Sequence, residues 1–276
     1  GALAALGRLA EATGRPELAA QLTNQSLATA AAMRAKLVSS ETGLFVDGAS
    51  GAAAAHTAIH SCIYPLAFGV AGGDAALEAR CFGKIETQLR AAWSAGTAYN
   101  LSVFAAAYLL KAVYAHDADH GALALDVLAS CGHDSWCHMI LEGATATMEA
   151  WTRDEKPNLS WSHPWGTAPT AAIVRGLMGV TATSPAFETF DVKPQPGGLR
   201  WASLRLPTAR GALTASFNQT AALGAAPASF ALRLGVPADA QATACLPRLG
   251  AKDDTLELDG VPVKGRAQGD YLCVGG

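Results

Sequence analysis

The segment from Glu142 to Gly166, EGATATMEAWTRDEKPNLSWSHPWG, combines the residue types that a carbohydrate-processing cleft uses. Its carboxylates can transfer protons, and its tryptophans offer flat aromatic faces for sugar rings. The pattern predicts a helix over residues 136–152, followed by a polar loop. A helix that delivers carboxylates beside an aromatic loop indicates a glycoside-cleaving or sugar-binding cleft.

Two glutamates in this segment are candidates for the chemistry. Glu142 and Glu149 are seven residues apart, which on a continuous helix is two turns on one face and a rise of about 10.5 Å. That rise is at the long end for two carboxylates that flank one glycosidic bond. The small residues between them leave room beside Glu149. Glu149 is therefore the candidate catalytic residue and Glu142 a candidate substrate contact, with a solvated surface charge as the competing interpretation.

Tryptophans gather in and around the same segment, at Trp136, Trp151, Trp161 and Trp165. Core packing accounts for most tryptophans in proteins. Trp161 and Trp165, however, flank His163 in a loop rich in serine and proline. For these two, stacking against a sugar is as good an interpretation as burial.

The rest of the chain divides into a helical part and a β part. Apolar spacing predicts helices from near the start to Gly14 and from Pro16 to about Val38, and then over 55–70, 75–92, 98–114, 119–130, 136–152 and 167–179. After about Ser184, short alternating runs separated by glycine turns predict the antiparallel strands of a sandwich. We place the domains at residues 1–183 and 184–276, a multidomain α+β chain of 276 residues.

Composition and motifs exclude several classes of function. The net charge of −3 gives no electrostatic footprint for nucleic acid, and no apolar run approaches the roughly 18 residues of a membrane span. Phosphate-binding glycine loops and the nucleophile elbow of serine hydrolases are absent. The histidine pairs His56/His60 and His116/His120, and the group His133/His138 near Cys131 and Cys137, match no standard zinc spacing. We expect neither a metal nor a cofactor.

The cysteines and asparagines bear on whether the protein is secreted. Cys131–Cys137 and Cys245–Cys273 are the pairs that could bridge, and buried free thiols are the alternative for each. The chain's four asparagines, Asn24, Asn100, Asn158 and Asn218, each begin an Asn-x-Ser/Thr triplet, the acceptor for N-glycans. Against this, Asn100 falls within the predicted apolar helix 98–114, where it would be buried. The triplets favour a secreted protein.

Several passages in a fixed order resemble the C-terminal half of bacterial-type and fungal-type α-L-rhamnosidases, an inverting class of glycoside hydrolases. These are TGLFVDG, AHTAIHSCIYPLAFGV, GATATMEAW, LSWSHPWGTAP and FDVKPQPGGLRWASL. The resemblance covers most of the chain. It departs from the usual passage GATTxWE at Ala146 and Met148, which changes the lining of a cleft without removing the carboxylate.

The resemblance implies an (α/α)6 toroid of about twelve helices followed by a small β-sandwich. Since only about eight helices are predicted, the toroid is expected to be incomplete, with apolar side chains exposed on the first helix and on the 98–114 helix. It further implies Glu149 as general base, and His163 and Trp165, with Trp161, as contacts to a rhamnose-containing glycoside. The family's general acid has no counterpart here, so the expected partner is a missing N-terminal half of the same protein.

Two other classes of function stay open at this level. One is a non-catalytic sugar-binding or structural remnant of the toroid. The other is a different toroidal glycosidase or a lyase acting on uronic acids, which is disfavoured because basic residues for a uronate carboxylate look scarce near the predicted site.

Overall fold

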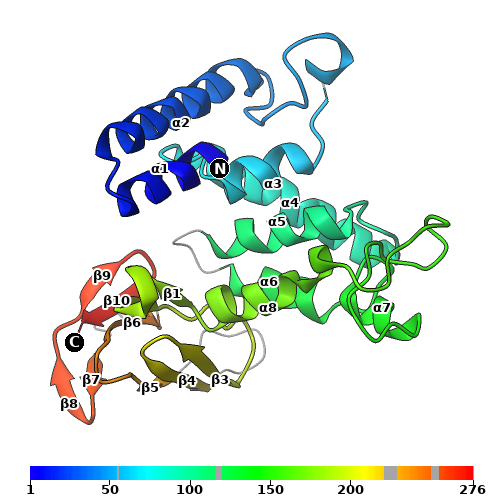
Figure 1. Cartoon of the computed structure of the whole chain (residues 1–276). Helices are drawn as coiled ribbons and strands as arrows, with labels where there is room; N and C mark the ends of the chain where they lie inside the picture. Colours follow the sequence, from blue (N-terminus) through cyan, green and yellow to red (C-terminus); the bar gives the residue numbers. More distant parts are fainter. Residues whose placement is uncertain (55, 116–119, 221–228, 250–254, 276) are drawn as a thin grey trace. The chain divides into compact units, whose positions relative to one another are not determined.

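A computed structural model describes residues 1–54, 56–115, 120–220, 229–249 and 255–275 (Figure 1). The chain separates into two compact units, Gly1–Leu101 and Ser102–Gly276, and each is described by itself. The first unit is helical. The second begins with helices and continues into β-structure.

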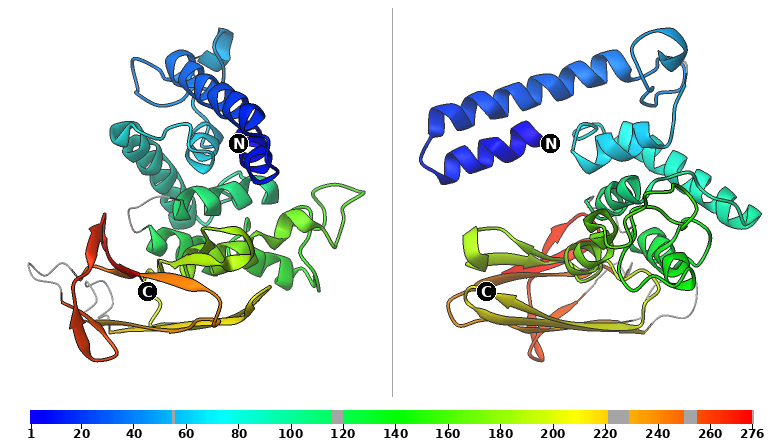
Figure 2. Two further views of the ribbon diagram at one scale, coloured as in Figure 1. Left: turned by 60° about the vertical axis from the view of Figure 1, so that its left-hand side comes forward. Right: turned by 45° about the vertical axis from the view of Figure 1, so that its right-hand side comes forward.

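The helices of the first unit pack as two hairpins. α1 (Ala2–Ala12) runs beside α2 (Pro16–Leu37), and α3 (His60–Ala67) packs on α4 (Ala75–Ala95) (Figures 1 and 2). Pro16 starts α2, where a missing N–H costs nothing, and the Asp74 side chain accepts a hydrogen bond from the Leu77 amide at the start of α4. Gly96 ends α4 with a φ of 62°.

The second unit opens with shorter helices. They are α5 (Val103–Tyr114), α6 (Gly121–Ala129), α7 (Trp136–Leu141) and α8 (Ala168–Ala172), with a π-helical turn at Ile173–Leu177. α5 packs against both α6 and α8. The predicted helix 136–152 is wrong beyond Leu141, because Gly143 takes a φ of 89° and the chain leaves the helical path.

The start of α5 also corrects a sequence prediction. Asn100 lies before the helix with a φ of 58°, and it is exposed. Ser102 then caps α5 by accepting a hydrogen bond from the Ala105 amide. Asn100 is therefore neither helical nor buried, and the objection to it as a glycan acceptor falls.

The β part forms two main layers. One sheet has the order β1-β2-β6-β10-β9, and the other has the order β3-β4-β5. Their strands are β1 (Val180–Ala182), β2 (Thr189–Val192), β3 (Trp201–Thr208), β4 (Gly211–Thr220), β5 (Ser229–Gly235), β6 (Gln241–Pro247), β9 (Arg266–Gln268) and β10 (Tyr271–Gly275). A separate hairpin pairs β7 (Leu256–Leu258) with β8 (Val261–Val263). Pairing is antiparallel except between β2 and β6, which run parallel.

The two layers share one apolar core. Leu213, Ala215 and Phe217 alternate along β4 and meet Phe190 and Val192 of β2. This period of two is the pattern from which the strands were predicted. Every element described after residue 200 is a strand, and helical hairpins followed by a small β region confirm the predicted fold class. The exact division at residue 183 stays a prediction.

Apolar side chains are exposed on α1, as expected for the first helix. They are largely buried on α5, where exposure was also expected. Leu6 and Leu9 of α1 are 50% and 59% exposed. α5, in contrast, is largely buried, and Phe104 is its large apolar side chain in the exposed class among the described residues. α5 is covered because α6 and α8 pack on it within the same unit.

Gly179 joins the helical part of the second unit to β1 and tolerates no side chain. Its φ is +67°, and a Cβ atom there would lie 1.9 Å from the carbonyl oxygen of Lys193. The Gly179 carbonyl also accepts a hydrogen bond of 3.0 Å from the Lys193 amide. The close backbone approach of residues 179 and 193 thus depends on glycine.

We expect Gly179→Ala to destabilise the chain by more than about 1 kcal/mol, since it adds a backbone clash to an unfavourable φ. The matched control is Gly83→Ala, at an exposed helical glycine with no atom within 4 Å of the added Cβ. That change should stabilise by roughly 0.5–1 kcal/mol. Denaturant unfolding of both variants measures the contrast, and equal effects would contradict it.

Candidate active site

Glu149 lies in a segment without regular secondary structure, between two buried residues. Met148 is fully buried and Ala150 is 7% exposed, while the side chain of Glu149 is 16% exposed. The Met148 amide contacts the Sδ atom of Met139 at 3.4 Å, which ties the segment to α7. Alternating burial therefore fixes the backbone of Glu149 and turns its carboxylate away from the core.

A pair of backbone contacts closes the loop that follows. The Glu149 amide donates to the Ser160 carbonyl at 3.0 Å, and the His163 amide donates to the Thr147 carbonyl at 2.8 Å. The Thr147 hydroxyl donates a hydrogen bond of 3.0 Å to the His163 carbonyl. These contacts bring His163 back beside the Glu149 segment.

Gly166 anchors the far end of the loop. A Cβ atom at this position would lie 2.4 Å from the Cβ of Thr147, and the Gly166 carbonyl accepts a buried hydrogen bond of 2.7 Å from the indole N–H of Trp136. Trp136 in turn stacks edge-on against Trp151 at 5.2 Å between ring centroids. These two tryptophans are core residues, as most tryptophans are.

The Glu149 carboxylate is held by charge and by hydrogen bonds. Lys156 Nζ bonds to Oε1, and the Ser160 amide donates to Oε2 at 3.1 Å. Lys156 is the main cause of a lowered pKa of Glu149, followed by the Ser160 amide, with a smaller electrostatic contribution from His163. Glu149 is therefore ionised at neutral pH, the form in which a carboxylate accepts a proton.

Glu142 has a different environment. Arg153 Nε donates to its Oε2 at 2.8 Å, and the same guanidinium donates to the Glu142 carbonyl at 2.7 Å. The Arg153 bond is the main cause of the lowered pKa of Glu142. His138 Nε2 lies 3.6 Å from Oε1. Because the helix ends at Leu141, Glu142 and Glu149 do not share a helical face, which corrects the prediction.

The two remaining tryptophans of the segment are exposed. Trp161 is 43% and Trp165 is 45% exposed. Trp165 stands edge-on to His163 at 4.4 Å between ring centroids and meets Phe104 of α5 at 5.2 Å. The Arg153 guanidinium lies 5.9 Å from the Trp161 ring centroid. The loop therefore presents aromatic faces to solvent beside an ionised carboxylate.

Sequence reasoning missed Lys156, Ser160 and Phe104. The expectation that basic residues are scarce near the site is also wrong, since Lys156 and Arg153 lie in it, each paired with a glutamate. Lys156 is seven residues from its partner across a loop, and loop pairing leaves no periodic signal in a sequence.

A third acidic residue with a shifted pKa, Asp47, organises the TGLFVDG motif of the first unit. Asp47 accepts hydrogen bonds from Ser61, from His56 and, at 2.9 Å, from the Ala58 amide. The Ser61 bond, then those from His56 and Ala58, lower the pKa of Asp47 to about 2. Asp47 fastens its loop to the start of α3, and its oxygens are occupied in doing so.

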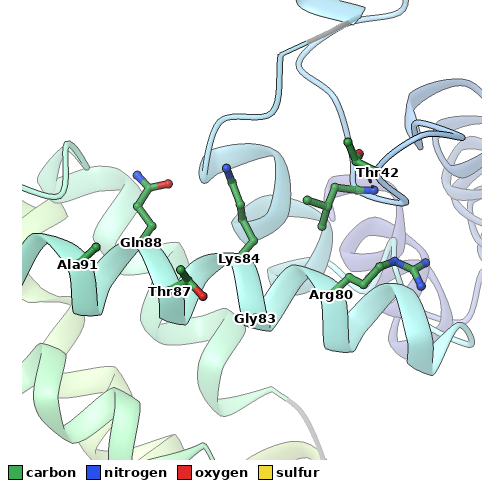
Figure 3. A pocket seen from close by; sticks show the side chains of 8 residues that line it. Thr42, Arg80, Gly83, Lys84, Thr87, Gln88 and Ala91 are labelled. Carbon is green, nitrogen blue, oxygen red and sulfur yellow. Dashed lines mark hydrogen bonds between the residues drawn. The ribbon is translucent and has the colours of Figure 1, made fainter.

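Two hollows lie away from Glu149. One of about 390 Å³ lies along α4, where Lys84 and Gln88 extend from the helix (Figure 3). It is lined by Thr42, Leu44, Arg80, Gly83, Lys84, Thr87, Gln88 and Ala91. The other, of about 440 Å³ and mostly apolar, lies between α5 and α8 with Lys111 and Arg175 at its wall.

Within the described ranges, no three histidine, cysteine or acidic side chains gather as a metal site would require. His116, part of one predicted pair, lies outside these ranges. None of the helices described is both long and apolar enough to span a bilayer.

Comparisons with known proteins agree with this architecture. The family model described as the bacterial alpha-L-rhamnosidase 6 hairpin glycosidase domain matches residues 2–176, and that of the bacterial alpha-L-rhamnosidase C-terminal domain matches residues 179–258. The chain belongs to this family. No curated protein matches it significantly.

Solved structures share the fold at low sequence identity. The α-L-rhamnosidase from Dictyoglumus thermophilum superposes with a TM-score of 0.79 at 16% identity, covering 99% of this chain and 29% of that one. The Streptomyces avermitilis α-L-rhamnosidase complexed with L-rhamnose superposes with a TM-score of 0.74 at 17% identity, covering 98% of this chain and 24% of that one. The Aspergillus terreus α-L-rhamnosidase superposes with a TM-score of 0.69 at 17% identity, covering 88% of this chain and 27% of that one. The chain thus spans less than a third of each of these proteins.

We expect Lys156→Met to raise the pKa of Glu149 toward its ordinary value, because the chief stabiliser of the charged form is lost. A folded-state pKa below the unfolded one adds stability at neutral pH that disappears as the pH falls through the folded value. The variant should therefore have a lower free energy of unfolding than wild type at pH 7. This difference should become smaller as the pH falls through the pKa of Glu149 in the folded wild type.

Carboxyl NMR titration and unfolding at several pH values measure both effects. Lys156→Arg, which keeps the charge, is the matched control and should leave the pKa of Glu149 low. An unchanged Glu149 titration in Lys156→Met would contradict the assignment.

Proposed function

We propose that this chain forms part of an inverting α-L-rhamnosidase, in which Glu149 is the general base. The supporting observation is an ionised, loop-held carboxylate beside exposed aromatic faces, in a chain that belongs to the rhamnosidase family. The substrate is then a glycoside with a terminal α-L-rhamnosyl residue, and no cofactor takes part.

The geometry fits the base half of the reaction. In an inverting hydrolysis one carboxylate activates water on one face of the sugar, while a separate acid protonates the leaving oxygen on the other. Glu149 can accept the proton from water with the lone pairs that Lys156 and Ser160 leave free. Lys156 and the Ser160 amide keep it charged and oriented, and no reorganisation is needed when the water approaches.

The general acid is proposed to come from residues outside this chain. The structural relatives are more than three times as long, which leaves room for a second carboxylate. Glu142 is unsuited to that role because it is bound to Arg153 with a lowered pKa, whereas a general acid needs a raised one. On this proposal the chain alone binds a rhamnoside weakly and does not hydrolyse it.

The aromatic loop is proposed as the sugar-binding surface. Trp165 can cover the apolar face of a rhamnose ring, and His163, half-buried against it, can exchange a hydrogen bond with a sugar hydroxyl. Trp161 extends the same surface. Arg153 and Lys156 are neutralised by their glutamate partners, which disfavours a uronate substrate.

We also propose that the protein is secreted. All four asparagines of the Asn-x-Ser/Thr triplets are exposed, so each can carry a glycan. Disulfides join Cys131 to Cys137 and Cys245 to Cys273, and such bonds persist in oxidising compartments. Mass spectrometry of the native protein, with and without glycosidase treatment, tests this directly.

Glu149→Gln, made in a rhamnoside-hydrolysing polypeptide that contains this segment, should lower turnover by about 10²–10⁴-fold, since a positioned base is lost. Rhamnose binding should largely persist. Glu155→Gln is the control, a carboxylate of the same loop that accepts a 3.2 Å bond from the Trp151 amide. Near-normal turnover in Glu149→Gln would exclude it from the mechanism.

His163→Ala should raise KM more than it lowers kcat, because the contact is made to both the bound substrate and the transition state. If His163 only secures the loop, the melting temperature falls and KM does not change. Steady-state kinetics together with thermal unfolding separate these outcomes. In the chain alone, titration with L-rhamnose tests whether the non-catalytic sugar-binding alternative holds.

A further inference from the structure

The two cysteines of the first unit are buried side by side. Cys62 lies on α3 and Cys81 on α4, both at 0% exposure, and the two helices pack on each other. Their thiols are hydrogen-bonded to one another. They are the only two cysteines among residues 1–101, and the other four cysteines of the chain are joined in disulfides within residues 102–276.

We propose that Cys62 and Cys81 are a third cross-linking site, which becomes a disulfide when the chain folds in the presence of a small-molecule disulfide. Thiols in hydrogen-bonding contact need only a small approach to reach the roughly 2.05 Å of a sulfur–sulfur bond. The bond would fasten α3 to α4 and enclose the connection between them, which contains Gly69, Gly72 and Gly73.

The local electrostatics assign different roles to the two thiols. The Cys62 hydrogen bond is the largest cause of a lowered pKa of Cys81, which a backbone bond at Phe45 and the nearby Arg80 charge lower further. The same contact and burial raise the pKa of Cys62. In the folded chain Cys81 is therefore the thiol that more readily becomes a thiolate.

The small-molecule disulfide is the oxidant in this thiol–disulfide exchange. The thiolate of one cysteine attacks one sulfur of that molecule and displaces a thiolate, leaving a mixed disulfide. The other cysteine then loses its proton and attacks the protein sulfur of the mixed disulfide, releasing a second thiolate. The two thiolates take up the two protons, and two electrons pass from the protein to the small molecule. Because both sulfurs are fully buried in the folded chain, the reaction belongs to folding or to transient opening of α3 from α4.

The test is to reduce and unfold the whole chain, refold it in a buffer of reduced and oxidised glutathione, and alkylate it in denaturant without reductant. Intact mass then counts thiols, and peptide mapping locates the bonds. We expect no alkylated cysteine and a Cys62–Cys81 linked peptide. Two alkylated thiols at Cys62 and Cys81, with the other two bridges formed, would overturn the proposal, as would Cys62 linked elsewhere.

Two variants provide further tests of the Cys62–Cys81 bond. Cys62→Ala should leave one alkylated thiol, at Cys81. The double variant Cys62→Ala/Cys81→Ala should melt below the wild type by several degrees when both are oxidised, and this difference should shrink when both proteins are reduced, because a cross-link restricts the unfolded chain. A gap that reduction leaves unchanged would instead reflect lost packing and would count against the bond. None of these readouts depends on rhamnosidase activity.

Discussion

The site rests on the backbone pairing between the segments Thr147–Glu149 and Ser160–His163. Two amide-to-carbonyl bonds and the Thr147 hydroxyl close a loop of irregular backbone on itself. Each such bond contributes only about 0.5–1.5 kcal/mol net, but an unpaired buried amide costs more than a made bond gains. The pairing therefore selects one loop conformation, and it places Glu149, Lys156 and His163 in one neighbourhood.

Packing beneath the loop makes that pairing possible. Gly166 can approach Thr147 only because it has no side chain, and its carbonyl is fixed by the indole of Trp136. Met148 and Ala150 are buried on either side of Glu149. A charged residue flanked by buried neighbours projects from an anchored backbone, so its carboxylate gains orientation while part of it stays in contact with water. This combination suits a group that must bind and activate a water molecule.

Glu142 and Glu149 are paired with different basic residues. Glu149 is held by a flexible ammonium group and one amide, and Glu142 by the planar guanidinium of Arg153. The guanidinium also bonds the Glu142 carbonyl, so this pair staples the end of α7 to the loop. The Glu149 side chain is 16% exposed and that of Glu142 is 23% exposed, so accessibility alone does not separate them. Both pKa values are lowered, yet only Glu149 is hydrogen-bonded through its backbone and its carboxylate to Ser160, in the loop that carries His163 and Trp165.

The sequence by itself determined the change from helices to strands and the family resemblance, and it offered Glu149 as a candidate base and the two disulfide pairs as options. Periodicity and ordered motifs are local properties, and they survive without knowledge of packing. Only the tertiary structure decided that the helix stops at Leu141, that Asn100 is exposed, and that Lys156 meets Glu149. Those outcomes depend on a glycine at positive φ, on a cap at Ser102 and on contacts across a loop. Such contacts join residues whose spacing carries no period, so no linear pattern could reveal them.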